Sequence, residues 1–143
     1  MTDRYAELKS EAWGWLKPIQ TVHLATWDGR YPRVRPVSMI FDEGRFWVST
    51  GASDAKVRQI GEHPVFEFSL MLKKGDEGGT LRCSGAAAIV TDTETKRTMS
   101  RRIPFFGQYW NTPDDPTFCL VELLVEEVEY MRPGDMTALR FSV

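Results

Sequence analysis

The sequence predicts a mainly β protein, a small closed or split antiparallel barrel flanked by helices, in one domain over residues 1–143. Six or seven strand-like runs follow one another, and tight turn signals such as Asp28-Gly29 join the early ones. Gly85, in the middle of a strand of small residues, permits the kind of bend that closes a barrel. Sequential strands with such bends favour a barrel over a flat open sheet.

The first half of the chain predicts two helices and a three-stranded meander. Thr2 or Asp3 can cap a helix that ends before Pro18. Strands are predicted at 21–27, 34–41 and 46–50, joined by turns at 28–29 and 42–44. Ser53 is a good N-cap for a second helix, which Pro64 stops.

The second half predicts further strands separated by a loop and a helix. A strand at 65–70 precedes a polar, Gly-rich loop at 73–79, and 81–90 forms the strand that contains Gly85. Asp92 can cap a helix that runs to about Met99. The remaining predicted elements are a loop at 112–116, a long strand at 117–130 and an edge strand at 136–141.

Composition excludes several classes of protein. The chain is 42% hydrophobic and 27% charged, which is ordinary for a globular domain. A net charge of −2 argues against general nucleic-acid binding, which requires an excess of basic residues. No apolar run approaches the roughly 20 residues that span a bilayer, and the N-terminus does not resemble a signal peptide. We therefore expect a cytoplasmic protein.

The cysteines and histidines form no catalytic or metal-binding pattern. Cys83 and Cys119 lie in apolar runs without CxxC spacing, so both are interpreted as buried packing thiols. His23 alternates with apolar residues on a strand, and His63 precedes Pro64 at a helix end. Each histidine is therefore interpreted as structural.

An anion-binding site is predicted where the second helix begins. With Ser53 as N-cap, Lys56 takes the third helical position, where an acidic side chain is favoured. A phosphate at the helix N-terminus would remove this mismatch, because it can accept hydrogen bonds from backbone N–H groups, Lys56, Ser49, Thr50 and a strand arginine. The alternative is an ordinary solvated lysine on a surface helix.

The strand arginines come from the segment Arg33-Val34-Arg35-Pro36-Val37. Alternation places Arg33 and Arg35 on one face. Pro36 lacks a ladder donor, so its strand is expected at an edge or to be locally irregular, which leaves the neighbouring backbone free for a ligand or a second chain. The alternative is a solvated exterior on which both arginines lie over apolar surface.

These motifs resemble the FMN-binding split barrels related to pyridoxamine 5'-phosphate oxidase, in particular the short general-stress-protein-like members. The resemblance covers roughly residues 18 to 131. It rests on six motifs in order: Leu24-Ala25-Thr26, Pro32-Arg33-Val34-Arg35-Pro36-Val37, Phe46-Trp47-Val48-Ser49-Thr50, Ser53 to Lys56 with Ile60 and His63-Pro64, Arg82-Cys83-Ser84-Gly85-Ala86-Ala87, and 121–130. It implies a six-stranded antiparallel split barrel and a homodimer that holds FMN at the subunit interface.

The resemblance also implies which residues bind the cofactor. Arg35 and Lys56 would hold the FMN phosphate, the backbone of residues 36–38 would meet the isoalloxazine edge, and Thr80 stands where many full-length oxidases present a glutamine to the flavin of the other subunit. The aromatic cluster at Phe106, Tyr109 and Trp110 could stack near the ring or serve burial alone. The full predicted set is Arg33, Arg35, Pro36, Val37, Ser38, Ser49, Thr50, Ser53, Asp54, Lys56, Thr80 and Trp110.

The function that the resemblance implies is an FMN-dependent oxidoreductase with an unassigned substrate. Only Arg132 and Arg140 stand in the C-terminal region where pyridoxamine phosphate oxidases grip the substrate phosphate, so vitamin B6 oxidation is not expected. The deazaflavin F420 is an alternative cofactor. A further alternative is a protein that binds flavin, or haem, without turnover, as a store, a sensor or a stress-response protein.

Overall fold

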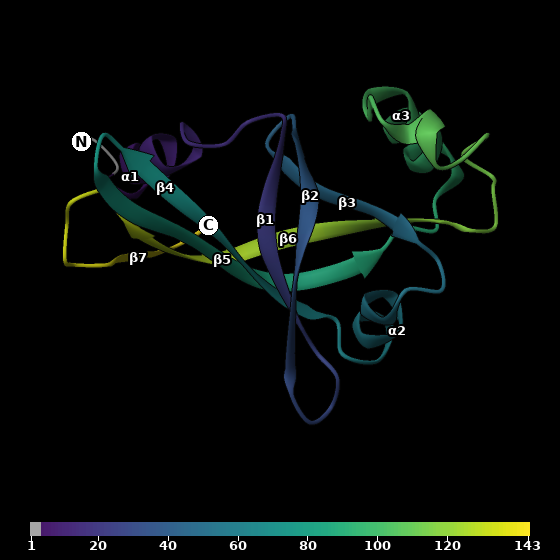
Figure 1. Ribbon diagram of the computed structural model, residues 1–143, viewed down its shortest axis with the longest axis horizontal. Coiled ribbons are helices and arrows are strands. Elements are labelled where there is room, and N and C mark those ends of the chain that lie inside the picture. The colour runs from purple at the N-terminus through teal and green to yellow at the C-terminus, as the bar shows by residue number, and fades with distance from the viewer. Residues whose placement is uncertain (1–3) are drawn as a thin grey trace.

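A computed structural model describes residues 4–143 and confirms a six-stranded antiparallel barrel (Figure 1). The elements are α1 (Arg4–Trp13), β1 (Ile19–Trp27), β2 (Pro32–Asp42), β3 (Arg45–Gly51), α2 (Ala55–Glu62), β4 (Val65–Lys74), β5 (Glu77–Ile89), α3 (Thr93–Arg102), the short 3-10 helix η1 (Phe106–Gln108), β6 (Phe118–Met131) and β7 (Leu139–Ser142). The strand order is β3-β2-β1-β4-β5-β6, and pairing of β3 with β6 closes the barrel. The short β7 pairs with the second half of β6.

The barrel interior is the main hydrophobic core, because alternate residues of each strand point inward. Its fully buried members include Leu24, Phe68 and Tyr130. Helices α1 and α2 lie on opposite sides of the barrel in Figure 1 and add Ala12 and Ile60 to this core. A second apolar cluster lies outside the barrel, where α3 and η1 cover the outward faces of β3 and β6.

Turn chemistry determined where the strands end. Residues 73–79 were expected to be a loop, but β4 runs to Lys74 and β5 starts at Glu77, so only a two-residue turn separates them. Gly75 adopts φ +61°, which suits such a turn. At position 79, β5 passes so close to the backbone of Met131 and Pro133 that a Cβ would collide with it. Glycine, which has no Cβ, fits there.

Other predicted elements are confirmed with small shifts. The Asp92 carboxylate accepts a hydrogen bond from the Thr95 backbone N–H at 3.0 Å and caps α3, which continues three residues beyond Met99. The register of β5 against β6 shifts between Ser84 and Gly85, as the glycine predicted. The last strand is shorter than expected, and the predicted caps of α1 at residues 2 and 3 lie outside the described residues.

Strand β2 is an edge over its first half. Residues 32–38 pair with β1, but β3 joins β2 only from Met39 onward. In Figure 1 the β1–β2 hairpin extends beyond the body of the barrel, near α2. Pro36 therefore lies where the missing ladder donor costs nothing, as its position in the sequence indicated.

The two cysteines agree with their expected role as buried packing thiols. Cys83 and Cys119 are buried and unpaired, and burial raises the pKa of both thiols. None of the helices within residues 4–143 has the length and apolar character needed to cross a membrane.

Candidate functional site

The start of α2 differs from the predicted one by a single residue. Asp54, not Ser53, is the N-cap, so Lys56 occupies the second helical position and not the third. Ser53 lies exposed in the preceding turn. The Asp54 side chain makes no bond to the helix N–H groups and instead turns back toward β3, where it meets Thr50.

Three donors converge on one oxygen of Asp54, and we call this arrangement the cradle. Its Oδ2 accepts hydrogen bonds from Thr50 Oγ1 at 2.5 Å and from the Gly51 backbone N–H at 3.2 Å, and Lys56 Nζ lies 3.1 Å away. These contacts, led by the Thr50 hydroxyl, lower the pKa of the Asp54 carboxyl. A hydroxyl, a backbone amide and an ammonium therefore surround an oxyanion at this point.

Arg35 reaches the same helix from strand β2. Its guanidinium donates to Thr26 Oγ1 at 2.8 Å, to Gln59 Oε1 at 3.0 Å and to the Leu24 carbonyl at 3.3 Å. All three acceptors are neutral, and within residues 4–143 no carboxylate pairs with Arg35. Partial burial lowers the pKa of Arg35, with no acidic partner to offset the loss of solvation.

Helix α2 connects the cradle with Arg35. Gln59, which accepts from Arg35, follows Lys56 by three positions on α2, which is about one turn. One cation, Lys56, belongs to this short helix and the other, Arg35, reaches it from β2, and only Lys56 has an acidic partner. This donor set suits the phosphate of FMN, which would be held by Arg35, Lys56, Thr50 and the Gly51 N–H.

Sequence reasoning missed Gln59 and Thr26. Both are buried polar residues, and Thr26 Oγ1 also donates to Gln59 Oε1 at 2.5 Å. A signal existed in the spacing, because Gln59 stands three residues after Lys56 and directly before the core residue Ile60. Only the packing of α2 on β1 shows that these two side chains orient Arg35.

Two other predicted phosphate ligands lie apart from the cradle. Arg33 donates to Asp28 at 2.7 Å in the β1–β2 turn and stacks over Tyr31. Ser49 precedes Thr50 on β3, so its side chain leaves the opposite face of the strand. Its hydroxyl is buried without a partner among the described residues, on the side of the second apolar cluster.

The residues predicted near the flavin ring lie in different parts of the molecule. Val37 points inward and packs on the barrel core, whereas Pro36 and Ser38 are exposed along the open edge of β2. Thr80 is on the outer face of β5, directly between Met71 and Met131 of the neighbouring strands. Trp110 is buried in the second cluster against Phe118, with ring centroids 4.9 Å apart.

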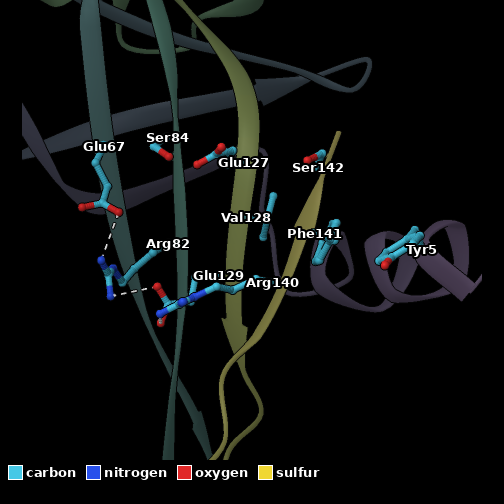
Figure 2. A pocket seen from close by; sticks show the side chains of 10 residues that line it. All are labelled: Tyr5, Glu67, Arg82, Ser84, Glu127, Val128, Glu129, Arg140, Phe141 and Ser142. Carbon is cyan, nitrogen blue, oxygen red and sulfur yellow. Dashed lines mark hydrogen bonds and ion pairs between the residues drawn. The ribbon is translucent and has the colours of Figure 1, made fainter.

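A broad depression lies away from the cradle. It has a volume of about 740 Å³ on the outer face of β4 to β7, next to α1 (Figure 2). Arg82 lies between Glu67 and Glu129, at 3.2 Å from each, and Arg140 approaches the other oxygen of Glu129 at 3.5 Å. The charges here largely neutralise one another.

Comparisons with known proteins agree with this fold. The family model "Pyridoxamine 5'-phosphate oxidase" matches residues 8–132. No curated protein matches the chain in sequence at a significant level.

Three solved structures illustrate the range of similar proteins. A NimC/NimA family protein from Clostridium acetobutylicum is 25% identical with a TM-score of 0.74, covering 94% of this chain and 92% of that one. General Stress Protein 26 from Bacillus anthracis strain Sterne is 19% identical with a TM-score of 0.67, covering 94% and 99%. A haem-binding protein from Mycobacterium smegmatis is 14% identical with a TM-score of 0.78, covering 99% of this chain and 59% of that one. With the family model matched over most of its length, the chain belongs to the pyridoxamine 5'-phosphate oxidase family.

Proposed function

We propose that this protein is an FMN-dependent oxidoreductase whose cradle and Arg35 hold the FMN phosphate. The observation that carries the proposal is Arg35, a partly buried cation with neutral acceptors only, which reaches the same helix as Lys56. A buried positive charge without an acidic partner is costly and is stabilised when an external anion binds. FMN, when bound, supplies the hydride- and electron-transfer chemistry, and the protein supplies orientation and electrostatics.

The open edge of β2 supports a place for the ring. Among the described residues, no strand pairs with residues 33–38 on the side away from β1, so amide N–H and carbonyl groups there could meet the polar rim of an isoalloxazine. This edge begins on the strand that carries Arg35. A cofactor with its phosphate at α2 would therefore extend along β2.

We propose that two copies of the chain share each flavin. The outer face of β4, β5 and β6 carries exposed apolar side chains in register: Val65, 51% exposed, is opposite Ala86, which is opposite Leu124, 45% exposed. Met71, 69% exposed, adjoins Thr80 on the same face. A second copy on this face would bury these side chains and bring Thr80 toward the partner's flavin.

The first test is the colour and affinity of the purified protein. Bound FMN gives a yellow protein with flavin absorption, whereas F420 or haem gives a different spectrum. Lys56→Ala should weaken FMN about ten- to a hundredfold, since a charge-assisted phosphate contact contributes roughly 1.5 to 3 kcal/mol. Riboflavin lacks the phosphate, so its affinity should change little. Equal losses for FMN and riboflavin would remove Lys56 from the phosphate site.

Turnover and assembly need separate measurements. Stopped-flow mixing of the FMN complex with NADH or NADPH should show flavin reduction if the protein is an oxidoreductase, and a flavin that no donor reduces would indicate a store or sensor.

Light scattering should report twice the chain mass even without FMN. Tight binding of one FMN per chain by a clean monomer would refute the shared site.

A further inference from the structure

The Asp54 carboxylate occupies the place that the FMN phosphate needs. Its Oδ2 takes the Thr50 hydroxyl, the Gly51 N–H and the Lys56 ammonium, which are three of the donors assigned to the phosphate. An N-cap aspartate ordinarily accepts from the N–H groups of its own helix, and Asp54 makes no such bond. Asp54 is thus an internal anion in a site suited to an external one.

Burial indicates which partner can leave. The Lys56 side chain is 15% exposed and Thr50 is buried, so both are held by their surroundings. The Asp54 side chain is 47% exposed and lies on the solvent side of the contact. A change of its side-chain rotamer would therefore free the three donors without moving strand or helix.

Charge makes simultaneous occupancy unfavourable. Lys56 and Arg35 supply two positive charges, whereas a phosphate monoester carries close to two negative charges at neutral pH and Asp54 adds a third. A phosphate and the Asp54 carboxylate that both contact the same donors would lie close together and repel each other. Binding of a phosphate therefore requires the carboxylate to turn outward.

We propose that Asp54 is a specificity-determining residue that competes with phosphate for the cradle. Only a phosphate ester with further contacts, such as a ring along β2, displaces the carboxylate, and inorganic phosphate does not. This inference rests on the proposed function, because it concerns the ligand selectivity of the same site. It assigns to Asp54 an opposing role, in contrast to the supporting roles of Lys56 and Arg35.

The test compares Asp54→Asn with the wild type by calorimetric titration of FMN, riboflavin and inorganic phosphate. Asparagine keeps an oxygen for Thr50 and Gly51 but removes the charge. We expect FMN to bind about three- to tenfold more tightly, riboflavin to bind unchanged, and inorganic phosphate to raise the unfolding midpoint of the variant but not of the wild type. Asp92→Asn, at the N-cap of α3, is the matched control and should change none of these values.

Several outcomes would overturn the inference. Equal FMN binding by Asp54→Asn would show that the carboxylate does not compete with the ligand, and weaker binding would show that it supports the ligand. A wild type that inorganic phosphate already stabilises would show that the carboxylate does not exclude phosphate. If Asp54→Asn does not fold, Asp54→Ser supplies the same comparison with a cap-compatible side chain. The proposed function fails separately: if Lys56→Ala binds FMN as tightly as the wild type, the phosphate site itself is misplaced, whatever Asp54→Asn does.

Discussion

Two strand arginines, Arg35 and Arg82, have opposite electrostatic surroundings. Arg82 on the outer face of the barrel lies between the carboxylates of Glu67 and Glu129, 3.2 Å from each. Arg35 donates only to neutral oxygens, those of Leu24, Thr26 and Gln59. The charge of Arg82 is neutralised by its own chain, whereas that of Arg35 is available to a ligand.

The difference explains why we propose the anion site near Arg35 and not in the depression around Arg82. The depression around Arg82 has a volume of about 740 Å³, but its arginines are already paired with carboxylates. The cradle donors converge on one point. The proposed anion site therefore rests on charge without an acidic partner and not on concavity.

Removal of the Arg35 charge should have the largest effect on cofactor affinity. Arg35→Met retains an apolar stem over the surrounding surface but removes the guanidinium. We expect FMN affinity to fall about ten- to a hundredfold, with little change for riboflavin, by fluorescence titration. Arg97→Met on the exposed face of α3 is the control and should bind FMN as the wild type does. An unchanged FMN affinity in Arg35→Met would contradict the distinction drawn between the two arginines.

Giving Arg35 a carboxylate should make it resemble Arg82. Gln59→Glu puts a negative charge where Gln59 Oε1 now accepts from Arg35 at 3.0 Å. We expect FMN to bind roughly tenfold more weakly, because the arginine is now neutralised within the chain. Gln20→Glu, which keeps an acceptor for the Lys17 backbone N–H, is the matched control. Tighter FMN binding by Gln59→Glu would exclude a direct role for the Arg35 charge.

Loss of the outer-face arginine should affect stability only slightly. Arg82→Met removes two ion pairs whose members are all partly exposed. Exposed ion pairs contribute about 0 to 1 kcal/mol, so the free energy of unfolding in urea should fall by less than about 1 kcal/mol, and high salt should shrink the difference. A loss of several kcal/mol would show that the ion pairs of Arg82 with Glu67 and Glu129 are essential to the fold.

The smallest expected effect is a pH dependence from Asp54. Its pKa is lowered in the folded chain, so its contribution to stability is fully present above the unfolded value of about 4 and is lost as pH falls through the folded value. The unfolding midpoint of the wild type should therefore fall more steeply than that of Asp54→Asn as pH drops below about 4. Parallel midpoint curves for the two proteins would show that the Thr50 and Lys56 contacts do not stabilise the charged carboxylate.

The sequence by itself determined the barrel and the main cations of the site. Alternating apolar residues with tight turns predicted the meander, Gly85 predicted the register shift, and Pro36 predicted the open edge of β2. Lys56 was identified because a cation is unfavourable in the first turn of a helix, and Arg35 was identified from strand alternation and the family resemblance. These are local properties, set by a few neighbouring residues and by the two-residue period of a strand.

Only the tertiary structure decided which side chains share a space. Gln59 and Thr26 orient Arg35 because α2 packs on β1, and Ser49 and Trp110 lie in the second cluster because α3 and η1 cover the outer face of β3 and β6. The Asp54 carboxylate bonds to the Thr50 hydroxyl, the Gly51 N–H and the Lys56 ammonium and not to the backbone N–H groups of its helix. Contacts between segments far apart in the chain depend on packing and on competition among donors, and neither is encoded in local sequence spacing.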